Sequence, residues 1–144
     1  MTSYEDIYES FLSKINDIDL ANYSNDDLEK QLDLYLGQAI SDFSDYCIKD
    51  LSDRDKDKKC FNITLDDREI DILSEFMVVR WLYPILNNLE NLRNTLNTSD
   101  FSIYSPANLL EKIEQRYSSA RMKARSMMNE YYLIHDTYDS WGNS

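Results

Sequence analysis

Three aspartates at alternate positions, Asp53, Asp55 and Asp57, are the clearest candidates for chemistry in this sequence, because that spacing opens a calcium-binding EF-hand loop. The match ends there. The sixth position of the loop is Lys58 where glycine is needed, and the twelfth is Thr64 where a bidentate glutamate is needed. We interpret the segment as a solvated run of charge, and the sequence predicts no metal site.

No other group of residues has the spacing of a catalytic or cofactor site. The single histidine, His135, has no serine or cysteine nucleophile with a local signature beside it. Cys47 and Cys60 form no CxxC pair, which argues against zinc and against a disulfide framework. We interpret acidic pairs such as Asp66 and Glu69 as complements of a helix dipole. The sequence therefore predicts neither enzymatic activity nor a cofactor.

The composition is that of one globular, helix-rich domain. The chain has 144 residues, of which 42% are hydrophobic, and it has only two glycines and two prolines. Because turn-forming residues are so scarce, a few long helices are favoured over many hairpins. The start has no signal-peptide pattern, and no apolar run approaches the ~20 residues that span a membrane. We expect a soluble, all-α protein without membrane contact.

Apolar residues at helical spacing predict a small bundle of four to five helices. They recur over residues 4–18 and again over residues 28–47. Each run follows a Ser-x-x-Asp start signal, at Ser3 and at Ser24. The charged segment from residue 49 to 59 has no apolar periodicity, so we expect an exposed connector there.

The densest apolar cluster lies between Thr64 and Pro106 and predicts a central helix that is buried on nearly all sides. We expect Thr64 and Asp67 to cap this helix. Pro84 is expected to kink it, because proline lacks the backbone N–H but apolar positions continue beyond it. Residues 97–105 are predicted to form a loop that is tied to the body or to a partner. The residues that define this central motif are Trp81, Pro84, Asp100, Phe101, Tyr104, Ser105 and Pro106.

A long final helix is predicted after Ser105-Pro106, because proline is favoured at the first helical position. Its apolar positions continue to about residue 132, so we expect a single domain over residues 1–132. At ~1.5 Å per residue this helix would reach roughly 40 Å, more than a compact body of this size covers, and part of it is expected to project. Residues 133–144 are predicted to be an extended tail that becomes ordered on a partner.

Charge is distributed unevenly along the chain. The net charge is −12; residues 1–57 carry 15 acidic and 5 basic side chains, whereas residues 101–144 carry five of each. The acidic half argues against direct binding of nucleic acid. The basic residues of the final helix either form a solvated face or meet the acidic half of a neighbouring copy. Together with the aromatic residues of the C-terminal segment, the candidate protein-interface residues are Lys112, Arg116, Arg121, Lys123, Arg125, Tyr131, Tyr132, Tyr138 and Trp141.

The order of several segments resembles that of the small head-to-tail connector (adaptor) proteins of tailed bacteriophages of Gram-positive hosts. The resemblance covers roughly residues 4–132. It rests on DLSDRD, Phe61-Asn62, LDDREIDILSEFMVVRWLYPILNN, ENLRNTL, SDFSIYSPANLL and the long closing helix. The most specific parts are MVVRWLYP and DFSIYSPAN.

The resemblance implies a helical structural protein of the virion neck, made in the host cytoplasm. Such proteins form a ring, usually of twelve copies, beneath the portal protein, and pass a C-terminal helix or tail to the portal. The ring adjoins head-closure or tail proteins and lines the DNA channel, where contact with DNA is passive and non-specific. Two alternatives are an acidic nucleic-acid mimic that inhibits a DNA-binding enzyme, and another neck protein, such as a β-rich head-closure or tail-terminator protein.

Overall fold

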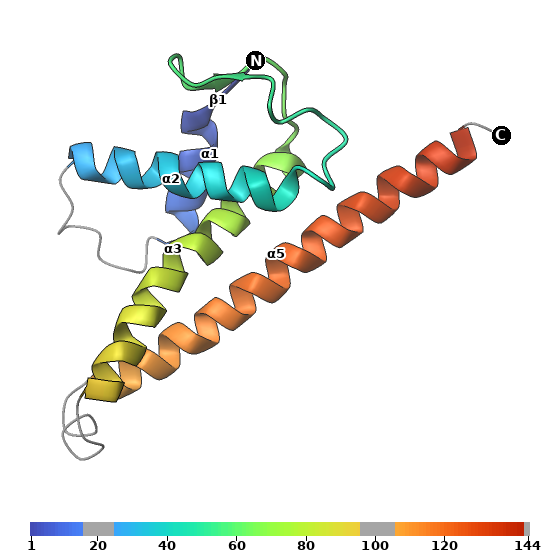
Figure 1. Ribbon diagram of the computed structural model, residues 1–144. Coiled ribbons are helices and arrows are strands. Elements are labelled where there is room, and N and C mark those ends of the chain that lie inside the picture. Colours follow the sequence, from blue (N-terminus) through green and yellow to red (C-terminus); the bar gives the residue numbers. More distant parts are fainter. Residues whose placement is uncertain (16–24, 96–105, 143–144) are drawn as a thin grey trace.

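The structure, a computed structural model, describes residues 1–15, 25–95 and 106–142. In these ranges it contains four helices and three short strands. The helices are α1 (Tyr4–Lys14), α2 (Asn25–Phe43), α3 (Asp67–Thr95) and α5 (Pro106–Gly142). The strands are β1 (Thr2–Ser3), β2 (Arg54–Asp55) and β3 (Cys60–Phe61). The prediction of a small all-α bundle with a long C-terminal helix is confirmed (Figure 1).

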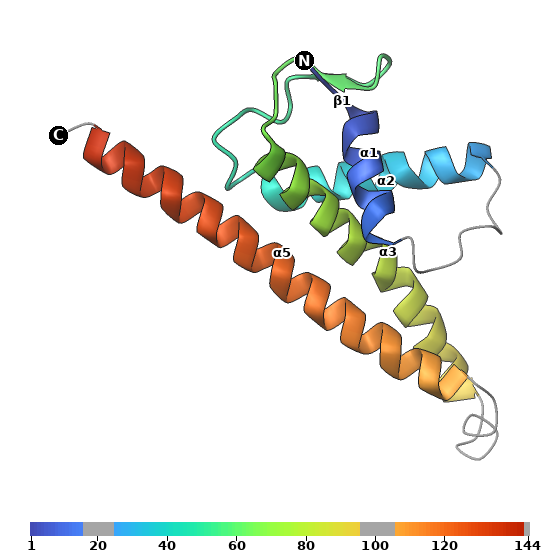
Figure 2. The same ribbon diagram turned by 180° about the vertical axis from the view of Figure 1, so that it is seen from behind.

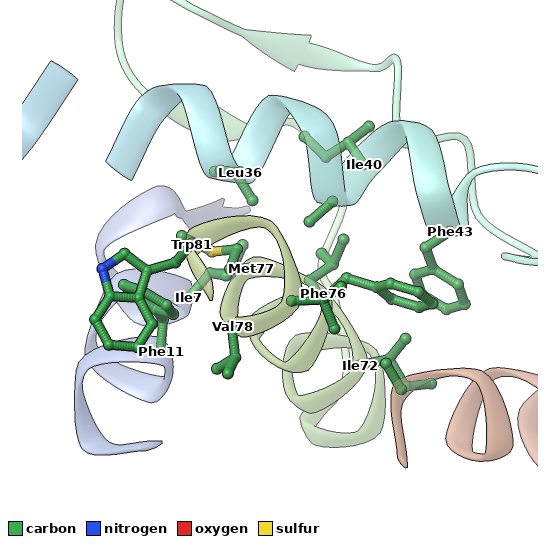
Figure 3. Close-up of a cluster of buried hydrophobic side chains, with 14 of the residues drawn as sticks. Ile7, Phe11, Leu36, Ile40, Phe43, Ile72, Phe76, Met77, Val78 and Trp81 are labelled. Atoms are coloured by element: carbon green, nitrogen blue, oxygen red, sulfur yellow. The ribbon is translucent and has the colours of Figure 1, made fainter. Parts of the chain in front are cut away.

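Helix α3 lies at the centre of the fold, as its dense apolar sequence predicted. Helices α1, α2 and α5 all pack against it (Figures 1 and 2). In the core, Trp81 of α3 meets Phe11 of α1 edge to face, with ring centroids 6.1 Å apart, and Met77 beside it is fully buried. Figure 3 shows Leu36 and Ile40 of α2 above the same turns of α3. Side chains around most of the circumference of α3 thus contact another helix.

The N-terminus of α3 has a different cap from the one predicted. Asp66 and Glu69 form a reciprocal capping box: the Asp66 carboxylate accepts from the Glu69 backbone N–H at 2.7 Å, and the Glu69 carboxylate accepts from the Asp66 N–H at 2.9 Å. The Thr64 hydroxyl accepts instead from the terminal amine of Met1 at 2.9 Å. Two pairs of residues here have the spacing of a capping box, Thr64 with Asp67 and Asp66 with Glu69. The prediction of a Thr64–Asp67 cap was wrong because the second pair forms the box.

The two longest helices compare differently with the local sequence signals: α3 ends close to its predicted end, and α5 extends further than predicted. Helix α3 is continuous through Pro84, so the proline does not break it. Helix α5 continues beyond its predicted end near residue 132 as far as Gly142, and most of the predicted extended tail is therefore helical. Once a helix has formed, each further residue adds a backbone hydrogen bond without needing an apolar stripe.

The three strands form a small antiparallel sheet that ties the N-terminus to the segment before α3. The order is β1-β3-β2, and Phe61 of the central strand lies opposite both Thr2 and Arg54. The backbone N–H of Tyr4 donates to the carbonyl of Lys59 at 2.9 Å. The sheet therefore positions the beginning of α1.

The charged segment from residue 49 to 59 is more structured than predicted. Leu51 is buried, and β2 and β3 make a hairpin. Its turn is closed by Asp55, whose carboxylate accepts from the backbone N–H groups of Asp57 and Lys58 at 3.0 Å, and by Lys59 in the left-handed region at φ 53°. The expectation of an exposed connector was incomplete because charge density does not indicate whether the backbone pairs with a neighbouring strand.

Gly37 lies inside α2, and its surroundings show whether a glycine is required at that position. A Cβ added there would have no atom within 4 Å, so no neighbouring helix requires the glycine. Replacing Gly37 with alanine is expected to raise the free energy of unfolding by about 0.5–1 kcal/mol, because alanine loses less backbone entropy in a helix. Urea denaturation measures this change, and a loss of stability would contradict the assignment of open space.

Candidate functional site

Helix α5 carries all nine predicted interface residues, and one stripe of its surface is buried in the core. Ala120 and Ala124 are buried one turn apart, and their small side chains let α5 lie close to α3. Ile113 and Tyr131 extend this buried stripe toward the two ends. Figures 1 and 2 show α5 running along α3 and then beyond the helical body at its C-terminal end. The remaining sides of α5 are open to other contacts.

Four of the five predicted basic residues divide between two sides of α5. Arg116 is half-buried, and its Nη2 donates to the backbone carbonyl of Lys14 at the end of α1, at 2.6 Å. Lys123 lies on the same side, 3.6 Å from the carboxylate of Glu75. Four of the five are exposed: Lys112, Arg121, Lys123 and Arg125. The structure brings Arg121 and Arg125 together one turn apart, on the side of α2.

These two arginines border an open depression between α2, α3 and α5, which we call the arginine hollow. It has a volume of about 270 Å³ and is lined by Asp42, Phe76, Val79, Arg80, Tyr83, Tyr117, Arg121 and Arg125. Arg80 is paired with Asp42 through hydrogen bonds of 2.8 and 2.5 Å. Within the described ranges, Arg121 and Arg125 have no such partner. Three arginines and one aspartate give the lining a formal charge of +2.

The aromatic residues predicted for the interface lie in different environments. Tyr131 is 0% exposed and belongs to the core, so its assignment to an interface was wrong for this conformation. Tyr132 is 44% exposed and packs edge to face on Tyr46, with centroids 5.6 Å apart. Tyr138 and Trp141 fall within the helical backbone of α5, but their side chains lie outside the part of the chain that the structure describes.

Those residues of the central motif that the structure describes have structural roles. Trp81 is buried against Phe11, and Pro84 is an exposed residue within α3. Pro106 is the first residue of α5, as predicted. Four further members of the motif lie outside the described residues: Asp100, Phe101, Tyr104 and Ser105.

A buried polar cluster that the sequence did not reveal joins α5 to the body. Its centre is Glu69, whose side chain is 0% exposed and accepts from Lys49 Nζ at 2.6 Å and from the Tyr131 hydroxyl at 2.7 Å. The Tyr131 hydroxyl also accepts from the backbone N–H of Ile48 at 3.2 Å. Cys47 Sγ lies 3.6 Å from the Glu69 carboxylate. We call Cys47, Lys49, Glu69 and Tyr131 the Glu69 cluster.

The Glu69 cluster holds its carboxylate ionised despite burial. Burial raises the pKa of Glu69, but the hydrogen bonds from Lys49, from the Asp66 backbone and from Tyr131 outweigh it, so that the pKa is lowered. Burial and the hydrogen bond to Glu69 raise the pKa of Tyr131, and burial raises the pKa of the Cys47 thiol. The tyrosine and thiol are therefore neutral donors to one charged carboxylate. Such a cluster fixes the position of α5.

The remaining candidates for chemistry have structural roles in the described chain. Asp53 accepts from the side-chain amide of Asn62 at 2.9 Å, and Asp55 closes the hairpin turn. The ring of His135 packs on that of Tyr131, with centroids 4.3 Å apart. Among the described residues there is no group of three or more His, Cys, Asp or Glu side chains placed to hold a metal ion.

Comparison of the chain with protein-family models, with curated proteins and with solved structures finds no match. In the ranges that the structure describes, no helix combines the length and the apolar character needed to cross a membrane.

Proposed function

We propose that this protein is a structural component of the neck of a tailed bacteriophage, where copies form a ring between the portal protein and the head-closure or tail proteins. One observation carries the proposal: α5 leaves the body with apolar residues exposed on several sides. Tyr132, Leu133 and Ile134 are 44%, 60% and 47% exposed. A helix that is apolar around much of its circumference is expected to be covered by a partner.

The resemblance to phage adaptor proteins implies that this partner is the portal protein. A projecting helix of the required kind is present, and it is held in a defined direction by the buried Tyr131 immediately before the exposed segment. The all-α fold disfavours the alternative of a β-rich head-closure or tail-terminator protein. The exposed Arg121 and Arg125 disfavour a nucleic-acid mimic, because a mimic of phosphate gains nothing from exposed guanidinium groups.

The charge of the chain is compatible with a ring through which DNA moves. Residues 1–57 carry most of the net charge of −12. In the proposed ring, acidic surface that is not covered by a neighbour repels the DNA backbone and keeps contact passive. A strongly basic lumen in an assembled ring would contradict this part of the proposal.

The proposal is tested by measuring binding between this chain and the portal protein of the same phage. We expect the full-length chain to co-purify with the portal, and expect truncation after Tyr132 to weaken binding by roughly tenfold or more, because apolar anchors dominate such interfaces. The full-length double variant Leu133→Ser/Ile134→Ser tests the same segment in a chain that keeps Tyr131 and the whole of α5.

The matched control is Lys30→Glu, which changes an exposed residue of α2 far along the chain from this segment. It should bind as the wild type does. Unchanged binding by both the truncated chain and the serine variant would refute the role of the segment, and a wild-type chain that does not bind the portal would refute the proposed function.

A further inference from the structure

The arginine hollow has unmet positive charge in a chain that is otherwise strongly acidic. Arg80 already pairs with Asp42, whereas Arg121 and Arg125 are exposed and have no acidic partner among the described residues. Phe76 and Val79 give the hollow an apolar floor. A partner that fits must therefore carry carboxylates or phosphates next to a surface that can cover apolar atoms.

The hollow on the opposite side of α5 lacks this property. It is lined by Lys14, Glu75, Val78, Arg116, Ser119, Ala120 and Lys123, with a volume of about 340 Å³. Two of its three cations face carboxylates of the same subunit: Lys14 lies 2.5 Å from Asp71 and 2.9 Å from Glu75, and Lys123 lies 3.6 Å from Glu75. The third, Arg116, donates to the backbone carbonyl of Lys14 at 2.6 Å. The arginine hollow is consequently the better candidate for an external acidic partner.

The exposed face of α1 has the complementary charge. Glu5, Asp6 and Glu9 are exposed, while Tyr4 and Ile7 of the same helix are buried in the core. Among the described residues, the three carboxylates have no hydrogen-bond or ion-pair partner. An uncompensated acidic face and an uncompensated basic hollow therefore occur on the same chain.

The spacing of the two charged pairs also agrees. Glu5 and Glu9 are one helical turn apart, and so are Arg121 and Arg125. At ~1.5 Å per residue each pair is separated by roughly 6 Å along its helix axis, so two helices that lie side by side can align both pairs. Arginine suits this role because its planar guanidinium can bind a carboxylate through two parallel hydrogen bonds.

We infer that the arginine hollow of one copy receives the acidic face of α1 from a second copy. This inference assigns a subunit contact to the proposed ring, and it rests on the proposed function. The hollow lies beside α2, which is in front in Figure 1, whereas α1 is in front in the opposite view of Figure 2. The two surfaces of a subunit are different and lie on different sides, so the contact is heterologous. Such contacts close into a ring when the rotation between neighbours permits.

Charge reversal on the full-length chain tests the contact by sedimentation velocity. Arg121→Glu/Arg125→Glu and Glu5→Lys/Glu9→Lys are each expected to weaken self-association by roughly tenfold or more, because like charges then face each other. A chain with all four substitutions restores opposite charges and should associate nearly as the wild type does. The matched control, Lys30→Glu/Lys58→Glu, changes net charge as much as the arginine variant but at other exposed positions, and should leave association unchanged.

Raising the ionic strength from about 0.05 M to about 0.5 M should weaken association of the wild type, because exposed charges are screened. The contact is overturned if the wild type does not self-associate, if either reversed variant associates as the wild type does, or if the four substitutions fail to restore association. Binding to the portal is measured separately. If a charge-reversed variant still self-associates and still binds the portal, the inferred contact is refuted but the proposed neck function is not.

Discussion

Replacing Tyr131 with alanine is expected to lower the free energy of unfolding by about 3–5 kcal/mol, the cost of removing a large buried aromatic side chain. Tyr131 is fully buried, packs on Phe43 with ring centroids 5.2 Å apart, and donates its hydroxyl to Glu69. The alanine variant loses the packing and leaves Glu69 without one of its donors. Urea denaturation followed by circular dichroism measures the change.

Two further variants separate packing from hydrogen bonding. Tyr131→Phe keeps the ring and removes only the hydroxyl, so it should cost about 1–3 kcal/mol, the penalty for leaving buried polar groups unpaired. Tyr132→Ala removes the adjacent, 44% exposed ring and should cost less than about 1 kcal/mol. Equal losses for Tyr131→Ala and Tyr132→Ala would contradict the placement of Tyr131 in the core.

Replacing Lys49 with methionine is expected to destabilise the fold by about 2–4 kcal/mol near pH 7, because it leaves the ionised Glu69 buried without its cation. The carboxylate of Glu69 is 0% exposed and Lys49 Nζ lies 2.6 Å from it. The loss should be smaller than for a fully buried pair, since the Lys49 side chain is itself 31% exposed. Lys30→Met, on the surface of α2, is the control and should have little effect.

The effect of Lys49→Met should also depend on pH. In the wild type the pKa of Glu69 is below its ordinary value of 4.5, so its stabilising contribution is complete above that value and is lost as pH falls through the folded pKa. Without Lys49, two of the influences that lower the pKa are lost, so the pKa of Glu69 rises relative to the wild type, and the penalty of the buried charge is relieved as pH falls through that higher pKa. The difference between variant and wild type should therefore shrink as pH is lowered from about 7 toward about 4. A difference that stays constant over this range would contradict the role of Lys49.

The Glu69 cluster connects stability with the proposed function. Tyr131 is the last fully buried residue of α5 before the exposed apolar segment at Tyr132, Leu133 and Ile134. By fixing Tyr131, the cluster sets the direction in which α5 leaves the body. Variants that weaken the cluster are therefore expected to affect presentation of the segment as well as stability.

Much of the helical architecture could be predicted because its signals are local. The apolar residues between Thr64 and Pro106 cover nearly the whole circumference of a helix, and that pattern requires partners on several sides. The structure provides them. The start of α1 at Ser3 could also be predicted, because the Ser3 hydroxyl accepts from the backbone N–H of Glu5, only two residues along the chain, at 3.2 Å.

The sequence could not identify the Glu69 cluster or the arginine hollow. Glu69 reads as an ordinary acidic residue in the first turn of a helix, and its burial depends on Lys49 and Tyr131, which come from different parts of the chain. Tyr131 reads as an interface aromatic because its local sequence is polar and aromatic. Only the packing of α5 on α3 decides which side of that turn faces inward.

The sequence by itself determined the helical class, the central position of α3, the uneven charge and the long final helix with its run of basic residues, because each follows from spacing or composition within a short segment. The tertiary structure decided which charges are matched within the subunit and which are left for a partner. Ion pairing and burial depend on side chains that approach in space from distant segments. The pairing of Arg80 with Asp42, beside Arg121 and Arg125 that have no ion-pair partner among the described residues, is a property of that arrangement.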